Sequence, residues 1–304
     1  MNFPVFDLHC DTALELLGKD LLSPKRLKQN DLHIDLERAK TLPGYCQCFA
    51  CFTTPYMRDW MQVSPEMVFQ LELDVILAEL ERNKRTMSLA YSPEDVRKNL
   101  EKGKMSAILT IEGPAGFGFD PELLEDLYKV GFRISSLGWN EQNVLTGSHK
   151  TSGGLTDLGK EYVKTAQKLG MIIDVSHISD EGFWDIMKVT DKPIIATHSN
   201  SRAVCDNSRN LTDDMFHTPE KYDVNGDWIM LLSVATHPFH RYRGYAQRVM
   251  RQVIADSQEQ GRKGIVLTCK EHLIPFYQKF GFKNEGKSDS THGGAVWYQM
   301  RLAF

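Results

Sequence analysis

Short segments rich in apolar residues recur along the first two thirds of the chain, and most are followed directly by a polar residue. They cover residues 5–8, 44–52, 105–111, 133–137, 171–175 and 193–197, of which 133–137 is the most mixed and is followed by Gly138. Apolar runs of this length are typical of strands that are buried on both faces of a parallel sheet. The pattern therefore predicts six strands.

The stretches between these runs have helical periodicity. Pro55 to Asn83 carries apolar residues at helical spacing and predicts one long helix. Ser92 and Pro93 suit the N-cap and the first position of another helix. Further helices are expected at 121–130, 156–169 and 180–188. Strands that alternate with helices favour an α/β fold, either an open parallel sheet or a (β/α) barrel.

Five residues of metal-ligand type stand directly after these runs. His9 and Asp11 follow the first run, whereas Glu112, His177 and His198 follow the third, fifth and sixth. Because the carboxyl ends of parallel strands share one edge of a sheet, these side chains should lie close together. Imidazole and carboxylate groups suit zinc or a similar divalent ion. The sequence therefore predicts a metal site at this edge.

Four short motifs carry a family resemblance. Asp-Leu-His-Cys-Asp-Thr at 7–12, Ile-Glu-Gly at 111–113, Asp-Val-Ser-His at 174–177 and Thr-His-Ser-Asn at 197–200 resemble, in order and spacing, the membrane (renal-type) dipeptidase family of zinc peptidases. The segments 154–160 and 208–210 are also similar to that family. The resemblance covers roughly residues 1–216 and implies a TIM-type (β/α) barrel.

The resemblance implies a role for each candidate ligand. Glu112 would bridge two zinc ions, His9 and Asp11 would complete one coordination sphere, and His177 and His198 would complete the other. Two zinc ions of this kind hold and acidify a bridging water, which then attacks the peptide carbonyl. The implied reaction is the hydrolysis of dipeptides.

Two further residues match substrate-facing positions of that family. Arg209 would bind the C-terminal carboxylate of the dipeptide, which suits a planar guanidinium, and an ordinary surface ion pair is the alternative. Trp139 stands where some members carry a substrate-facing histidine, and a tryptophan is similar to the bacterial pattern. The family also places a catalytic aspartate after the last barrel strand, but no Asp-Phe-Asp-Gly-like stretch follows Arg209. We therefore expect an incomplete barrel with about six native strands.

A different pattern begins after residue 216. Residues 217–228 are polar and rich in turn formers, which predicts a junction. A strand at 229–235, a helix at 246–258, a strand at 265–268 and a short helix at 272–280 follow. The turn between the first strand and helix reads Arg241-x-x-Gly244-x-Ala246. Backbone N–H groups of such a turn, at a helix N-terminus, can bind a pyrophosphate.

Residues 229–304 resemble the C-terminal half of the GNAT acetyltransferase superfamily, which binds acetyl-CoA. By that resemblance Arg241, Gly244 and Ala246 would line the pyrophosphate site, and Tyr277 would donate a proton to the departing thiolate. A packed helix aromatic is the alternative for Tyr277. We expect a small GNAT-like α/β lobe that is separate from the barrel. The other arrangement would use its strands as the missing seventh and eighth strands.

Composition limits the partners. The formal net charge is −4 over 304 residues without a basic stripe, which argues against a nucleic-acid partner. No apolar run reaches the length of a membrane span and no secretory leader opens the chain, so we expect no membrane association and a cytoplasmic location. Cys46, Cys48 and Cys51 share one predicted strand and indicate buried thiols, with a thiolate metal site as the alternative.

Three functional hypotheses follow. The leading one is a zinc-dependent dipeptidase, formed by residues 1–216, that acts on dipeptides through two zinc ions. The alternatives are an acetyl-CoA-binding N-acetyltransferase module in residues 229–304, and an inactive fusion chain. The oligomeric state stays open, with a homodimer as one alternative.

Overall fold

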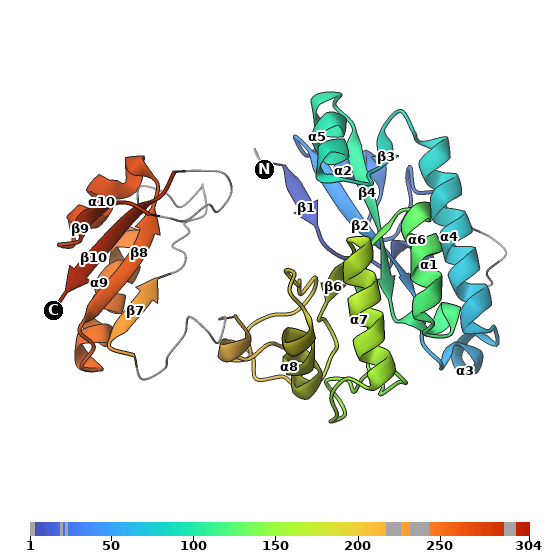
Figure 1. Ribbon diagram of the computed structural model, residues 1–304. Coiled ribbons are helices and arrows are strands. Elements are labelled where there is room, and N and C mark those ends of the chain that lie inside the picture. Colours follow the sequence, from blue (N-terminus) through green and yellow to red (C-terminus); the bar gives the residue numbers. More distant parts are fainter. Residues whose placement is uncertain (1–3, 19–20, 22–23, 217–225, 232–242, 289–295) are drawn as a thin grey trace. The chain divides into compact units, whose positions relative to one another are not determined.

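The computed structural model describes residues 4–18, 21, 24–216, 226–231, 243–288 and 296–304 (Figure 1). Contacts divide the chain into two compact units, Met1–Phe216 and His217–Phe304. Each has its own sheet and its own hydrophobic core. Most of the predicted junction, 217–228, lies outside the described residues.

The first unit is built on a six-stranded parallel sheet. Its strands are β1 (Val5–Asp7), β2 (Tyr45–Phe52), β3 (Met87–Leu89), β4 (Met105–Glu112), β5 (Phe132–Ser136) and β6 (Ile172–Asp174). The order is β1-β2-β4-β5-β6, with β3 paired to β4, and every pair is parallel. The prediction of an incomplete TIM-type barrel is therefore confirmed as a parallel half-barrel.

Two strands differ from the prediction. β3 was not predicted, because it is only three residues long and follows directly on the helix region. Conversely, residues 193–197 form a single parallel bridge between Ile195 and Asp174 rather than a full strand. Ile195 N–H donates to the Ile173 carbonyl at 2.9 Å, and Val175 N–H donates to the Ile195 carbonyl at 2.8 Å. The segment thus still runs alongside β6, which keeps His198 at the same edge as the other candidate ligands.

Helices connect these strands. They are α1 (Thr12–Leu16), α2 (Leu36–Ala39), α3 (Met57–Met61), α4 (Pro65–Arg82), α5 (Pro93–Glu101), α6 (Leu124–Val130), α7 (Asp157–Leu169) and α8 (Asp180–Val189), with short 3₁₀ turns at Pro114–Phe117, Pro121–Leu123 and Asp213–Phe216. No helix in the described part of the chain combines the length and the apolar character that crossing a membrane requires.

The single long helix predicted at Pro55–Asn83 is wrong, because the chain breaks between α3 and α4. Gln62 adopts a left-handed backbone conformation with φ of 57° and ends α3. Ser64 then accepts a hydrogen bond from Met67 N–H as N-cap, and Pro65 occupies the first turn of α4. Ser followed by Pro is a helix-start signal, and here it outweighs the apolar periodicity that spans the break.

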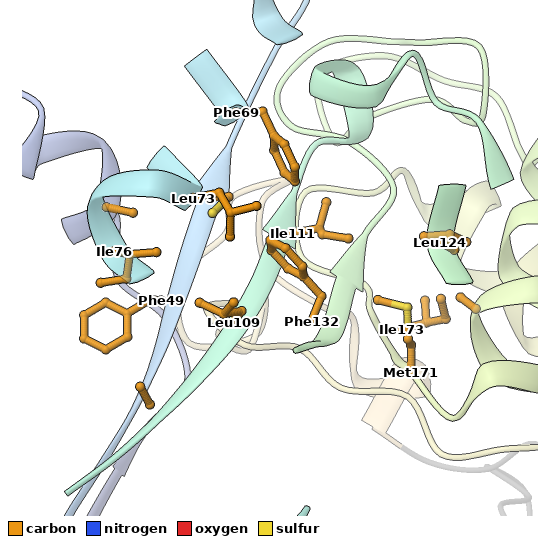
Figure 2. Packing of buried hydrophobic residues seen from close by; sticks show 14 of the residues in the cluster. Phe49, Phe69, Leu73, Ile76, Leu109, Ile111, Leu124, Phe132, Met171 and Ile173 are labelled. Carbon is orange, nitrogen blue, oxygen red and sulfur yellow. The ribbon is translucent and has the colours of Figure 1, made fainter. Parts of the chain in front are cut away.

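The core of the first unit lies between its central strands and α4 (Figure 2). Phe49 of β2 and Leu109 of β4 are fully buried, and both belong to one cluster with Ile76 of α4. Phe69 of α4 stacks on Phe132 of β5 with ring centroids 5.6 Å apart. This packing fixes the central strands, and so fixes the edge at which they end.

The second unit holds a mixed four-stranded sheet. Its elements are β7 (Trp228–Leu231), α9 (Tyr245–Glu259), β8 (Gly264–Cys269), a 3₁₀ turn at Glu271–Leu273, α10 (Ile274–Gln278), β9 (Lys283–Lys287) and β10 (Tyr298–Ala303). The strand order is β7-β8-β10-β9. Met250 of α9, Ile265 and Leu267 of β8, and Met300 of β10 form its core.

The described strands of the second unit pair within their own sheet. β7 pairs in parallel with β8 inside its own sheet, from Trp228 opposite Gly264 to Leu231 opposite Leu267. Among the described residues, no strand of this sheet pairs with β1 or β6. The alternative in which borrowed strands close the barrel is therefore wrong for this part of the chain.

Candidate metal centre

The five predicted metal ligands lie at one edge of the half-barrel. Glu112 is the last residue of β4, and His9 and Asp11 follow β1 within a few residues. His177 follows β6, and His198 follows the bridged segment at Ile195. Because these strands are parallel, their carboxyl ends bring residues far apart in sequence to one place.

The Glu112 carboxylate lies at the middle of this group and is only 5% exposed. Its Oε1 is 3.0 Å from His177 Nε2 and 3.4 Å from His198 Nε2, and its Oε2 is 3.3 Å from His9 Nε2. Asp11 Oδ1 lies 3.4 Å from His9 Nε2. One carboxylate thus contacts three imidazoles through their Nε2 atoms.

Residues from the two ends of the sheet meet in this centre. His9 follows β1, the first strand in the sheet order, and His198 follows the segment paired with β6, the last strand. Their rings nevertheless stack with centroids 3.8 Å apart. The ligand atoms of His9, Glu112 and His198 all lie within 4.8 Å of one another, which is a spacing that one metal ion could span.

Electrostatics favour positive charge beside Glu112. Burial alone would raise the pKa of its carboxyl, but its contacts with His177, His198 and His9 outweigh burial and hold that pKa well below its usual value. Burial likewise opposes protonation of His9, yet Asp11 and Glu112 raise the pKa of this imidazole to about 10. Burial lowers the pKa of His177. The group therefore attracts a cation, whether a proton or a metal ion.

Asn140 selects the tautomer of His177. Asn140 Oδ1 lies 3.0 Å from His177 Nδ1 and 2.7 Å from His149 Nε2. A carbonyl oxygen can only accept, so both imidazoles donate an N–H to it. With Nδ1–H bound to Asn140, the neutral His177 ring turns the lone pair of Nε2 toward Glu112.

A second hydrogen-bond chain does the same for His198. Thr197 Oγ1 donates to Asp174 Oδ2 at 2.6 Å and lies 2.6 Å from His198 Nδ1. Because the Thr197 proton is used on Asp174, His198 Nδ1–H donates to Thr197. The Nε2 lone pair of His198 therefore also faces the centre, where it lies 2.9 Å from His177 Nε2.

These donors fit a divalent cation. Two imidazole lone pairs and a carboxylate repel one another at such distances unless a positive charge lies between them. Nitrogen donors near 2.0–2.1 Å and oxygen donors near 2.0–2.2 Å are the usual zinc environment, and hydrogen bonds from the far imidazole nitrogen are its usual support. His9, Asp11, Glu112, His177 and His198 could therefore hold metal.

The pattern of the sequence did not single out Asn140 or His149. Asn140 directly follows Trp139 after the fourth predicted strand, so its place at a strand end was the available signal. His149 lies in a loop and bonds Ser208 Oγ through Nδ1 at 3.2 Å. Burial, with the positive charges of Arg209 and Lys150, lowers the pKa of His149 to about 4, so this ring is neutral at pH 7.

The two predicted substrate-facing residues lie beside the centre. Arg209 Nη1 donates to Ser199 Oγ at 2.7 Å, whereas its buried Nη2 has no hydrogen-bond partner among the described residues. Burial lowers the pKa of Arg209, although Asp174 and Glu112 act in the opposite direction. The ring of Trp139 lies 6.1 Å from that of His177. The ordinary surface ion pair considered for Arg209 is absent from the described contacts.

The predicted acetyl-CoA residues fall in the second unit. Gly244 is the N-cap of α9, with a left-handed φ of 78° and open space around its Cα, and Ala246 lies in the first turn of that helix. Tyr277 packs in the core of this unit and is only 6% exposed. Arg241 lies outside the described residues. The roles predicted for these four residues stay predictions.

The thiols of β2 are buried. All six cysteines of the chain are free, and Cys46, Cys48 and Cys51 lie on β2 with little or no exposure. Burial raises the pKa of Cys46 to about 12, which keeps this thiol protonated and a poor metal ligand. Among the described residues, the thiols of β2 form no cluster of metal ligands.

Comparison with known proteins agrees with both parts of the chain. The model of the membrane dipeptidase family (Peptidase family M19) matches residues 1–224, and the model of the acetyltransferase (GNAT) domain matches residues 213–284. An uncharacterized protein from the PQQ-III 3′ region of Acinetobacter calcoaceticus is 29% identical over 238 residues, which is 70% of this chain and 75% of that protein. Dipeptidase verJ of Clonostachys rogersoniana is 27% identical over 164 residues, 53% of this chain but only 42% of that protein.

Solved structures give the same result. A metallo peptidase from Rhodobacter sphaeroides, liganded with a phosphinate mimic of the dipeptide L-Ala-D-Ala, has a TM-score of 0.61 at 26% identity and covers 71% of this chain and 70% of that chain. The dipeptidase AC has a TM-score of 0.60 at 28% identity, and the match covers 71% of this chain and 68% of that chain. With a GNAT domain at its C-terminal end, the chain belongs to the membrane dipeptidase family of metallopeptidases, Peptidase family M19.

Proposed function

We propose that this chain is a zinc-dependent dipeptidase that binds two zinc ions, with Glu112 as the bridging ligand. The observation that supports this most is that the Glu112 carboxylate contacts three imidazole Nε2 atoms. In His177 and His198, hydrogen bonds to Asn140 and Thr197 keep the proton on Nδ1, so that the lone pair is on Nε2. His9 and Asp11 would complete one site, and His177 and His198 the other.

The residues of this chain would share the work of binding a dipeptide. Bound zinc would supply an acidified water and polarise the peptide carbonyl. Arg209, whose Nη2 has no partner in the described part of the chain, would bind the C-terminal carboxylate of the dipeptide through its planar guanidinium. Asn140 and Thr197 would hold the ligand imidazoles in place. The catalytic aspartate expected after a last barrel strand has no counterpart in the sequence, so turnover is measured separately from metal binding.

The test is metal content together with dipeptide hydrolysis. The purified chain should bind about two zinc ions per molecule, and Glu112→Gln should lose most of this metal, because a neutral amide bridges two cations poorly. Glu125→Gln on α6, which changes an exposed carboxylate paired with Lys129, is the matched control and should keep its zinc. Full zinc occupancy in Glu112→Gln would overturn the bridging role. Zinc without hydrolysis would leave the third hypothesis, an inactive fusion chain.

A second candidate function is acetyl-CoA binding by the C-terminal unit, which the GNAT match at 213–284 and the left-handed N-cap Gly244 support. Backbone N–H groups at the start of α9 would bind the pyrophosphate. Gly244→Val should weaken acetyl-CoA binding in calorimetry. Gly261→Val, at the other end of the same helix, has φ of 70° and equally open surroundings, so it controls for backbone strain. If the parent chain shows no heat of binding when acetyl-CoA is added, acetyl-CoA binding is excluded as a function.

Two expectations stay predictions. The chain is proposed to work in the cytoplasm, and its oligomeric state stays open with a homodimer as one alternative; neither follows from the described residues. Fractionation of cells that contain the natural chain would decide the first, and light scattering coupled to size exclusion would decide the second.

A further inference from the structure

A row of three aromatic rings leads outward from the metal centre. The ring of Trp139 lies 6.1 Å from that of His177, the ring of Trp60 lies 5.4 Å from Trp139, and the ring of Tyr56 lies 6.0 Å from Trp60. Tyr56 is the N-cap of α3 and Trp60 belongs to that helix, whereas Trp139 follows β5. We call Tyr56, Trp60 and Trp139 the aromatic ledge.

The outer part of the aromatic ledge faces solvent. Trp60 is 53% exposed and Tyr56 is 46% exposed, although large aromatic rings are usually well buried. The inner part rests on a small hydrophobic cluster of Phe52, Met57 and Val68, which is separate from the main core and also contacts Trp139. The ledge is therefore a supported apolar surface rather than a scatter of single exposed rings.

Charge indicates which end of a dipeptide this surface would meet. Thr54 Oγ1 donates to Glu141 Oε1 at 2.9 Å and accepts from Tyr56 N–H at 3.4 Å, so a carboxylate lies beside the ledge. Arg209 Nη1 donates to Ser199 Oγ on the segment that follows His198, whereas Glu141 lies on the segment that follows Trp139 after β5. Glu141 Oε2 is buried and has no hydrogen-bond partner among the described residues, so it could accept a hydrogen bond from the ammonium group of a dipeptide whose carboxylate is bound at Arg209.

We propose that the aromatic ledge binds the side chain of the N-terminal residue of the dipeptide, and that the protein prefers dipeptides whose N-terminal residue is aromatic or large and aliphatic. This proposal rests on the dipeptidase function proposed above. Ring stacking and the removal of apolar surface from water would supply the preference. A small N-terminal side chain such as that of alanine would leave the ledge uncovered.

Hydrolysis of Phe-Ala, Ala-Phe and Ala-Ala by the zinc-loaded chain tests the proposal. The parent should hydrolyse Phe-Ala with kcat/KM at least about tenfold above both other dipeptides, since side-chain pockets discriminate on this scale. Trp60→Ala should lower kcat/KM for Phe-Ala far more than for Ala-Ala, and so remove that preference. Tyr91→Ala is the control and should keep the preference, because Tyr91 is 46% exposed, as Tyr56 is, but contacts Arg133 instead of the ledge. Equal rates on all three dipeptides would overturn the ledge while leaving the dipeptidase function intact.

A binding measurement tests the aromatic ledge even if the chain does not hydrolyse dipeptides. Calorimetry on the zinc-loaded chain would use analogues of Phe-Ala and Ala-Ala in which CH₂–NH replaces the peptide bond. Tighter binding of the Phe analogue, lost in Trp60→Ala but kept in Tyr91→Ala, supports the ledge even if no dipeptide is hydrolysed. Equal affinity for both analogues overturns it.

Discussion

Two hydrogen-bond acceptors behind the proposed metal centre decide which nitrogen of His177 and which nitrogen of His198 faces Glu112. Asn140 Oδ1 binds Nδ1 of His177, and Thr197 Oγ1 binds Nδ1 of His198. The proton on Nδ1 of each of these two rings leaves Nε2 free to bind a metal ion, although Nδ1 itself would not touch the metal. Neither acceptor would be chosen from residue type alone, because asparagine and threonine are not zinc ligands.

The first prediction concerns Asn140. Asn140→Ala should lower zinc affinity by about 10–100-fold, the usual effect of losing a partner that orients a ligand histidine. Competition with a chelator of known affinity measures this on the folded protein. His149→Ala is the control, since it removes the other partner of Asn140 and leaves the bond to His177 in place. If both variants lose zinc equally, the loop as a whole supports the site, and Asn140 has no special role.

The second prediction concerns Arg209. Arg209→Lys should raise KM for dipeptides much more than it lowers zinc content, because lysine keeps the charge but loses the planar fork. Arg202→Lys, in the same loop, is the control. Arg202 binds both carboxylate oxygens of Asp180 at 2.7 and 2.8 Å, so its loss should lower the melting temperature and leave KM unchanged. Parallel loss of zinc and activity in Arg209→Lys would assign Arg209 a structural role.

At the scale of the elements, α4 carries two fully buried carboxyl groups with opposite surroundings. Glu79 accepts hydrogen bonds from Leu27 N–H and Arg82, and it also pairs with Arg26. Among the described residues no cation pairs with Glu72, and burial raises its pKa well above the usual value, with only partial compensation from the backbone of Phe52. Glu72 therefore holds a proton in the folded state at a pH where the unfolded chain has released it.

The third prediction follows from this proton. Stability should fall as pH rises from the unfolded pKa of Glu72, near 4.5, toward its raised folded value, because the folded state binds the extra proton in that window. Glu72→Gln cannot ionise, so its melting temperature should decline less than that of the parent between about pH 5 and about pH 8. Glu79→Gln should instead lower the melting temperature throughout. Parallel curves for parent and Glu72→Gln would contradict the prediction.

Strand ends were predictable from sequence because ligand-type residues directly follow apolar runs, and parallel strands end together. This reasoning located His9, Glu112, His177 and His198 at one edge without any knowledge of pairing. Local signals failed where tertiary contacts decide the outcome. Residues 87–89 form a strand only because β4 offers an edge there, and 193–197 form one bridge because no further strand lies beyond them in the described sheet.

At the scale of the whole molecule, each unit has its own hydrophobic cluster. The fourth prediction is that calorimetry of the full chain shows two unfolding transitions, and that zinc raises only one of them, since all the predicted ligands belong to residues 1–216. Acetyl-CoA should act only on the other transition. A single transition that moves as a whole with zinc would show that the domain boundaries proposed from sequence do not mark independent units.

The stacking of His9 on His198 joins the first and last strands of an unclosed sheet. β1 pairs only with β2 among the described strands, so its outer edge presents unpaired backbone groups of the kind that recruit other chains. A bound cation would link His9, which follows β1, to His198, which follows the segment paired with β6, and so hold the two edges of the half-barrel together. Removal of the cation by a chelator should then promote aggregation as well as abolish hydrolysis, because the exposed edge of β1 could pair with strands of other chains. The concentration of available zinc would then determine how soluble the protein is and how long it stays folded in the cell.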